Sequence, residues 1–535
     1  MTEVQILDDT LAEQASQTAA QLAAERFASK LTSGDDTLWG SEAQSEASIR
    51  LAWTTLHETS RPLLAEIEAL RAAYLDEGVS RFVLAGMGGS SLAPEVITQT
   101  AGVQLVVLDT TDPQQVADAL AGELRRTAVI VSSKSGGTVE TDSHRRIFEA
   151  AFTEQGIDAA SRIVVVTDPG SPLQHLAEEA GYRKVFLADP HVGGRYSALT
   201  AFGLVPAGLA GADIAGLLDD AADAAKELSA DSASNPALLL GAALGNAHSA
   251  GAEKVVLADN HSGITGFADW AEQLIAESTG KNGTGLLPVA VESPEAPGFA
   301  DAGADATPVT IGQPTGAAKL ATSGSLGGLM LLWEYATAVA GKLLGINPFD
   351  QPDVEAAKQA ARDLLGKPSG AGEEASPNFV VDEVEVYAAE DWIGQARSLT
   401  EAIKALLDAA PEAGYLAVQA YLDRIDDASA AVLRGELAAR SGLQTTFGWG
   451  PRFLHSTGQY HKGGHQNGVF LQITGANADD LEVPEQPFTL GGLQHAQALG
   501  DGSVLAAHER PVLRLHLTDR LAGLSAIAAA IGGLA

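Results

Sequence analysis

The sequence predicts an α/β protein with two lobes, each built on a parallel sheet. From Arg81 onward, short runs of β-branched and apolar residues alternate with helical segments. Such alternation is typical of parallel strands that are flanked by helices. A second alternation begins at Lys254 and continues nearly to the end of the 535 residues, which is enough chain to bury more than one core. We therefore expect two similar lobes that face a shared cleft.

The order of these patterns divides the chain into four parts. Residues 1–75 are rich in Ala, Glu, Leu and Gln, with apolar residues at helical spacing, and predict a helical arm. Residues 76–235 and 236–518 carry the two alternations, and residues 519–535 predict an apolar helix. Ligands of open parallel sheets bind at the carboxyl ends of strands, so the loops in those places are the candidates for a site.

The charge balance narrows the classes of partner. There are 69 Asp and Glu against 33 Lys and Arg, a net charge of −36 that should repel nucleic acid and anionic membranes. There is no Cys, which excludes disulfides, a thiolate nucleophile and a cysteine metal site. The N-terminus lacks a basic start and an apolar leader core, and the most apolar stretches are interrupted by charge or too short to span a bilayer. We expect a cytoplasmic protein.

Glu277 lies near the predicted end of an apolar helix. Phe267, Trp270 and Leu274 fall on one helical face, and a run of Ser, Thr, Gly and Asn after Glu277 cannot easily continue the helix. A carboxylate there faces the negative end of the helix dipole, which makes ionisation harder and suits a proton-transfer base. A solvated Glu before a capping turn is the alternative.

Two glycine-containing loops follow predicted strands of the first lobe. GMGGSSLAPE, residues 86–95, has neither the dinucleotide-binding spacing nor a Walker lysine. SSKSGGTVET, residues 132–141, gathers hydroxyls, a lysine and exposed amides before a helix, which suits a phosphate monoester. A serine-rich turn that only caps the helix is the alternative.

Arg195 and a late histidine loop are further candidates. Arg195 follows two glycines, so its guanidinium could stand in a cleft and neutralise an oxyanion, or form a surface salt bridge. His455, His461 and His465 match no metalloprotease spacing and have no Cys or close carboxylate beside them. We expect no metal there, but one catalytic histidine followed by solvent-facing ones.

Together, these segments resemble the phosphoglucose isomerases. The segments are GMGGSS, SSKSGGTVET, GGRYSALT, EQLIAESTGKNG and NPFDQPDVEAAK, within a resemblance from about residue 81 to 517. GPRFLHSTGQYHKGG, residues 450–464, is most similar to the isomerase half of actinobacterial bifunctional transaldolase/phosphoglucose isomerases. Residues 1–75 are too few for the transaldolase barrel. The resemblance implies two sugar isomerase domains with αβα sandwiches, interconversion of glucose 6-phosphate and fructose 6-phosphate, and no metal or organic cofactor.

The resemblance also implies roles for residues. It assigns Glu277 as the base between C1 and C2, Arg195 as the group that stabilises the enediolate, and His455 and Lys358 as the ring-opening pair. The substrate-binding residues that it implies are Gly89, Ser90, Ser133, Lys134, Ser135, Thr138, Gln273 and Gln351.

The order of the late segments departs from the family. The family's ring-opening histidine precedes the NPFDQ segment, whereas His455 follows Lys358 here. In the usual enzymes that histidine comes from the partner subunit, so a homodimer is the expected partner unless the rearrangement makes the histidine local. Two alternatives remain open, a non-catalytic sugar-phosphate-binding regulator and an isomerase that also accepts mannose 6-phosphate.

Overall fold

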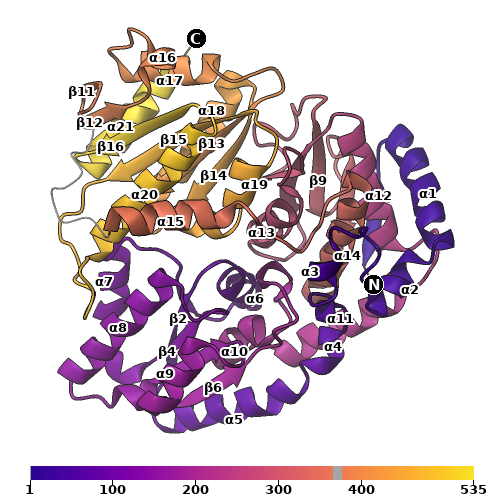
Figure 1. The fold of residues 1–535 in the computed structure, drawn as a ribbon, viewed down its shortest axis with the longest axis horizontal. Coiled ribbons are helices and arrows are strands. Elements are labelled where there is room, and N and C mark those ends of the chain that lie inside the picture. The colour runs from indigo at the N-terminus through magenta and orange to yellow at the C-terminus, as the bar shows by residue number, and fades with distance from the viewer. Residues whose placement is uncertain (1, 366–375, 535) are drawn as a thin grey trace.

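The computed structural model describes residues 2–365 and 376–534, and the side chains in those ranges except at 354–358, 390 and 391. The predicted α/β class with parallel sheets is confirmed, because helices flank sheets whose strands are mainly parallel (Figure 1). The described residues form three sheets. We call each sheet with its helices the first, second or third unit, in the order of the main strands along the chain.

The first unit is a five-stranded sheet in the order β3-β2-β4-β5-β6, parallel throughout. Its central strands are buried on both faces, which fits their continuous apolar runs. The strands are β2 (Arg81–Gly86), β3 (Val106–Leu108), β4 (Thr127–Ser132), β5 (Ile163–Thr167) and β6 (Lys184–Leu187). The helices are α6 (Leu92–Ala101), α7 (Pro113–Ala121), α8 (Val139–Glu154), α9 (Pro172–Ala180) and α10 (Ala201–Ala210).

The second unit has the strand order β1-β10-β9-β7-β8, and its edge strand β1 runs antiparallel to β10. The strands are β1 (Glu3–Ile6), β7 (Lys254–Asn260), β8 (Leu287–Val291), β9 (Ala306–Gly312) and β10 (Leu320–Ser323). The helices are α11 (Ile214–Leu228), α12 (Pro236–Ser249), α13 (Phe267–Thr279), α14 (Leu326–Leu344) and α15 (Val354–Leu365). Of these, α15 packs against α20 of the third unit.

The third unit has the strand order β11-β12-β16-β15-β13-β14, with β16, β15, β13 and β14 parallel. The strands are β11 (Phe379–Val381), β12 (Val384–Tyr387), β13 (Tyr415–Tyr421), β14 (Gln444–Trp449), β15 (Gly468–Gly475) and β16 (Val512–Leu517). The helices are α16 (Glu390–Ile393), α17 (Leu399–Asp408), α18 (Val432–Ser441), α19 (Gly458–Gly463), α20 (Leu490–Ala507) and α21 (Arg520–Gly532).

The structure differs from the prediction in the number of sheets. Residues 236–518 were expected to form one lobe, but they build two separate sheets. The sequence pattern marks each strand, whereas the choice of neighbouring strand depends on contacts between segments that are far apart along the chain. The long helix α14 follows β10 and the later strands pair only among themselves. A third sheet is the result.

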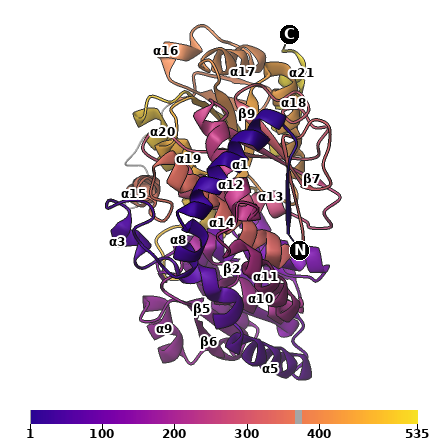
Figure 2. The same ribbon diagram turned by 90° about the vertical axis from the view of Figure 1, so that its right-hand side faces the viewer.

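The N-terminal arm is helical apart from β1. Its helices are α1 (Asp9–Ala24), α2 (Phe27–Thr32), α3 (Gln44–Ala47), α4 (Leu56–Thr59) and α5 (Pro62–Asp76). Helix α1 packs against α12, and Figure 2 shows it lying along the side of the molecule. The arm therefore covers the second unit with α1 and contributes its edge strand β1, while α5 packs against α10 of the first unit. In the described ranges, no helix has the length and apolarity to cross a membrane.

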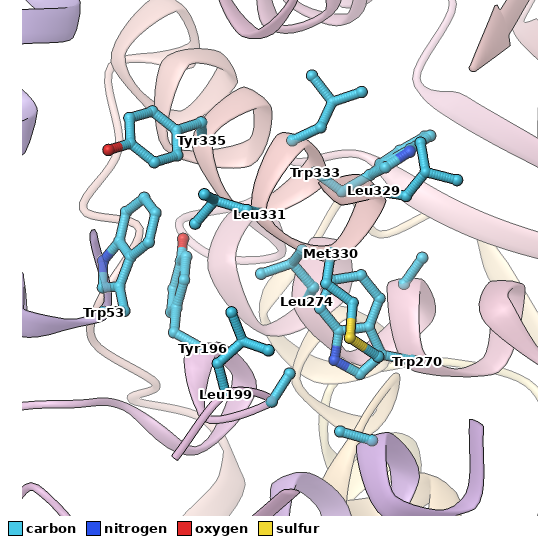
Figure 3. Packing of buried hydrophobic residues seen from close by; sticks show 14 of the residues in the cluster. Trp53, Tyr196, Leu199, Trp270, Leu274, Leu329, Met330, Leu331, Trp333 and Tyr335 are labelled. Atoms are coloured by element: carbon cyan, nitrogen blue, oxygen red, sulfur yellow. The ribbon is translucent and has the colours of Figure 1, made fainter. Parts of the chain in front are cut away.

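A core of large aromatic side chains holds the segments around the candidate site (Figure 3). Trp53 stacks on Tyr196 with ring centroids 4.9 Å apart and meets Tyr335 of α14 edge-on at 5.0 Å. The Tyr196 hydroxyl is 3.3 Å from Ser278 Oγ. Since Arg195 and Glu277 are their chain neighbours, this packing fixes both functional candidates relative to each other.

Candidate active site

A cavity of about 460 Å³ contains most of the residues that the resemblance singles out. It lies at the carboxyl ends of β2 and β4, against the end of α13 and the loop after β14. The predicted residues that line it are Gly89, Ser90, Ser133, Lys134, Ser135, Thr138, Gln273, Glu277, Gln351 and His455. All three units therefore contribute to one cavity.

Close backbone approach explains two glycines of this cavity. A Cβ on Gly89 would collide with the carbonyl of Gly194, and one on Gly88 would lie 2.7 Å from the carbonyl oxygen of His455. Gly88 also has a φ of +55°, which side chains other than that of glycine rarely adopt. The GMGGSS loop thus makes room for the loops that carry Arg195 and His455.

Glu277 is buried near the end of α13, with 7% of its side chain exposed. Its Oε2 lies 3.2 Å from Arg195 Nη1, and Gln273 Nε2 donates to its Oε1 at 3.4 Å. Burial raises the pKa of Glu277, against the lowering effects of Arg195, the Gln273 hydrogen bond and His455. The alternative of a solvated glutamate is therefore wrong, and burial is the main cause of the harder ionisation.

Arg195 is also buried, with 3% of its side chain exposed. It lies in the short 3-10 helix Gly194–Tyr196, which Tyr196 anchors in the aromatic core. Its guanidinium donates to Gln351 Oε1 at 3.2 Å and to the Asp350 carbonyl at 2.9 Å. A surface salt bridge is excluded, because the guanidinium is buried against Glu277, next to residues that line the cavity but not itself among them.

The SSKSGGTVET loop forms a concentrated set of donors before α8. Ser133 Oγ and Thr138 Oγ1 are 3.0 Å apart, and the Gly136 amide donates to Ser133 Oγ at 3.2 Å. Thr138 precedes α8 but its side chain does not cap the helix. The amides at the positive end of α8 are therefore not occupied by that hydroxyl, which favours an anion in this place.

The ammonium group of Lys134 is already engaged with other groups of the protein. Its Nζ is 2.7 Å from Asp168 Oδ2 and donates to the Val192 carbonyl at 2.9 Å. Burial raises the pKa of Asp168, although Lys134 acts in the opposite direction. The lysine charge is therefore partly neutralised, so backbone amides and hydroxyls supply most of the local attraction for an anion.

His455 reaches the cavity from the third unit of the same chain. It ends the 3-10 helix Arg452–His455, and its carbonyl accepts a hydrogen bond from Gln273 Nε2 at 2.9 Å. Its Nε2 lies 3.1 Å from Glu140 Oε1, to which Gln497 Nε2 donates at 2.7 Å. The residue is thus held by contacts with both the first and the second unit.

The other two histidines have different surroundings. His461 is buried, stacks on Tyr415 and shares a 3.1 Å hydrogen bond with its hydroxyl. Burial lowers its pKa well below the usual value, so it is neutral. The expectation that it faces solvent is wrong, because its ring fills a gap in the aromatic packing. His465 is exposed and contacts Glu253, so the three histidines do not converge.

The position of the Lys358 side chain relative to the cavity is not described by the structure. The residue belongs to α15, and its side chain lies outside the part of the chain that the structure describes. Its ring-opening role stays a prediction.

Two residues near the cavity were not singled out from the sequence. Glu140 lies within the SSKSGGTVET segment but resembles an ordinary acidic residue in a first helical turn. Lys281 donates to the Asn347 carbonyl at 2.8 Å and to Asp350 Oδ1 at 2.7 Å, which ties the end of α13 to the segment with Gln351. Burial and the nearby Arg195 lower the pKa of Lys281 to about 8. Their contacts are with distant segments, so no local signal marked them.

Comparisons with known proteins identify the family. Residues 58–306 match the family described as phosphoglucose isomerase. The chain is 30% identical over 372 residues to a probable glucose-6-phosphate isomerase of Haloarcula marismortui, covering 59% of this chain and 83% of the relative. The chain belongs to the phosphoglucose isomerase family. A glucose-6-phosphate isomerase of Rubrobacter xylanophilus, another family member, is 30% identical over 384 residues, which are 58% of this chain and 88% of that protein.

Solved structures agree on the fold of this phosphoglucose isomerase family member. A hypothetical protein from Thermus thermophilus matches with a TM-score of 0.59 and 26% identity, covering 69% of this chain and 100% of that one. A glucose-6-phosphate isomerase from Chlamydia trachomatis matches with a TM-score of 0.55 and 19% identity, covering 70% and 90%. The family match at 58–306 contains Glu277 and the phosphate loop, while His455 lies beyond it.

Proposed function

We propose that this protein is a glucose-6-phosphate isomerase, which interconverts glucose 6-phosphate and fructose 6-phosphate through an enediolate. The observation that carries the proposal is the buried pair of Glu277 and Arg195, 3.2 Å apart, because Glu277 lines a cavity that also holds a phosphate-type loop. A raised carboxyl pKa suits a group that must accept and return a proton within one turnover.

The phosphate end of the substrate fits the loop of Ser133, Lys134, Ser135 and Thr138. Its hydroxyls and the amides before α8 offer several neutral donors, and these suit a dianion better than a single lysine that already faces Asp168. The phosphate would orient the sugar so that its reacting carbons extend toward Glu277, at the other side of the cavity.

Proton transfer follows from the same arrangement. In the forward direction, Glu277 removes the proton from C2 of the open aldose, and the electrons of that bond form the enediolate. Arg195 stabilises the developing negative oxygen. The proton then returns from Glu277 to C1 while the proton of the O2 hydroxyl moves to O1, so that the C2 carbonyl forms and the product is the ketose. The general-base step is worth roughly 10²- to 10⁴-fold, and charge stabilisation roughly 10²- to 10³-fold.

Ring opening is assigned to His455, with Lys358 as the predicted second group. The contact of His455 Nε2 with Glu140 Oε1, at 3.1 Å, supports this because a carboxylate can orient an imidazole that transfers a proton to and from the ring oxygen. His455 and Glu277 line the same cavity of one chain. We infer that a homodimer, if formed, is not needed to supply this histidine.

A non-catalytic sugar-phosphate regulator would need only the phosphate loop. The buried Glu277–Arg195 pair and the His455–Glu140 contact favour the isomerase instead, since mere binding gains nothing from a carboxylate that resists ionisation. Acceptance of mannose 6-phosphate is left to measurement, by comparing turnover of the two sugars.

The Glu277→Gln variant tests the proposal. It keeps the size and the hydrogen-bonding shape of the side chain but cannot accept the proton, so we expect turnover to fall about 10³-fold or more while glucose 6-phosphate still binds within about threefold. Turnover would be followed by a coupled assay in the presence of a chelator, and binding by calorimetry.

Glu272→Gln is the matched control, because Glu272 lies on the same helix but does not line the 460 Å³ cavity. We expect it to turn over at nearly the parent rate. Turnover of Glu277→Gln within tenfold of the parent would overturn the proposed function.

A further inference from the structure

Three carboxylates from two units meet outside the active-site cavity. Asp118 lies on α7 of the first unit, and Asp423 and Asp426 lie in the loop after β13 of the third unit. One oxygen of each carboxylate can be chosen so that all three lie within 4.8 Å of one another. Helix α7 lies at the border between these units (Figure 1), where the Arg424 amide and guanidinium donate to Gln115 and to the Val107 carbonyl.

Asp423 is the buried member of this cluster, with 1% of the residue exposed. Its Oδ1 accepts the amides of Ile425 at 2.8 Å and Asp426 at 3.1 Å. Its Oδ2 is buried too, and within the described ranges it has no hydrogen-bond partner. A buried carboxylate oxygen without a partner is costly, so its presence calls for a ligand.

The charged side chains around the three carboxylates are engaged elsewhere in the described ranges. Among the described residues, no Lys or Arg forms an ion pair with Asp118, Asp423 or Asp426. The arginines of the neighbourhood serve other groups: Arg424 pairs with Glu95, and Arg520 pairs with Asp112 and Asp427.

We propose that Asp118, Asp423 and Asp426 bind one divalent cation, with Ca²⁺ preferred. Carboxylate oxygens are the ligands of hard cations, and Ca²⁺ accepts them at about 2.3–2.6 Å with water completing its shell. Oxygens that lie within 4.8 Å of one another are close enough to share one such ion. Three protein carboxylates suit Ca²⁺, whereas Mg²⁺ keeps several waters and is usually held by only one or two carboxylates.

The cation would join the third unit to the first. None of its ligands lines the 460 Å³ cavity, so it takes no part in proton transfer. It would instead hold the unit that carries His455 against the unit that carries Glu140, beside the existing contact between Arg452 and Glu95. Its role is stability of this interface.

Calcium titration of the full chain tests the site. After treatment with a chelator and its removal, CaCl₂ in about 0.15 M salt, which screens diffuse attraction to the acidic surface, should give saturable binding of one ion in calorimetry. It should also raise the melting temperature by about 2 °C or more at a large excess over Kd. Turnover of glucose 6-phosphate at 25 °C should not change with calcium.

Two variants locate the site. Asp118→Asn changes an exposed helix residue and Asp423→Asn removes the buried charge; each should weaken calcium binding at least tenfold and abolish the rise in melting temperature. Asp479→Asn, in an exposed loop, should behave as the parent. Absence of saturable calcium binding to the parent overturns the proposal, as does an unchanged calcium response in Asp118→Asn. A stronger response to MgCl₂ than to CaCl₂ would overturn the preference for calcium.

Discussion

The two walls of the active-site cavity are built in different ways. The binding wall, residues 132–138, offers many weak donors on one loop before one helix. The chemical wall, where the proposed function places Glu277 and His455 with Arg195 directly behind Glu277, consists of single charged or titratable groups from three units, each fixed by partners far away in the sequence. Redundant donors tolerate the loss of one member, whereas a lone proton-transfer group does not. Substitutions on the two walls should therefore differ in size and in the kinetic constant affected.

The largest effect, after that of Glu277→Gln, is expected for Arg195→Lys. Lysine keeps the charge but cannot reach Glu277, Gln351 and the Asp350 carbonyl at once, so turnover should fall about 10²- to 10³-fold. The measurement is kcat with glucose 6-phosphate, and Arg183→Lys on the surface is the control. If only KM changed in Arg195→Lys, the expectation that the chemical wall controls kcat and the binding wall controls KM would be wrong.

His455→Asn should cost less, about 10- to 10²-fold in kcat, because sugars also open without a catalyst. Glu140→Gln should reproduce part of this loss, since Glu140 contacts His455 Nε2. His465→Asn, which removes an exposed histidine beside Glu253, is the matched control. A parent-like kcat for His455→Asn would exclude this histidine from the chemical wall.

Ser133→Ala tests the binding wall. Its hydroxyl is one of several donors, so we expect KM to rise about tenfold while kcat changes little. Thr153→Ala serves as the control, because Thr153 lies at the exposed end of α8, the helix that follows this loop. A drop in kcat larger than the rise in KM would mean that the loop takes part in the chemistry and not only in holding phosphate.

The smallest effect is a pH dependence of stability. The folded-state pKa of Glu277 is raised above its ordinary value of 4.5, so the folded protein holds this proton more tightly than the unfolded chain. This contribution to stability is fully present below the ordinary value and is lost as pH rises through the raised one. Glu277→Gln should therefore melt higher than the parent at pH 8.

At pH 4.5 the two melting temperatures should converge. A constant difference across this range would contradict the raised pKa. The same ionisation should give the acid limb of the parent's kcat/KM a midpoint above 4.5.

The sequence predicted the site motifs that consist of adjacent residues, but not the contacts between segments that are far apart along the chain. The phosphate-type loop, the end of α13 at Glu277 and the glycines before Arg195 each depend on a few adjacent residues, and the predicted cavity members lie together. The third sheet was not predicted, because the alternation of strand and helix patterns indicates where strands lie but not which strands pair. Glu140 and Lys281 were missed for the same reason, since their partners lie on other segments.

The position of His455 within the same chain has a kinetic consequence. A residue borrowed from another molecule is lost on dilution, whereas a tethered one keeps a fixed effective concentration at its target. Since His455 and Glu277 line one cavity of one chain, specific activity should stay constant as the enzyme is diluted to nanomolar levels. On the proposed role of His455, the third unit supplies within one chain a group that would otherwise have to come from a partner subunit.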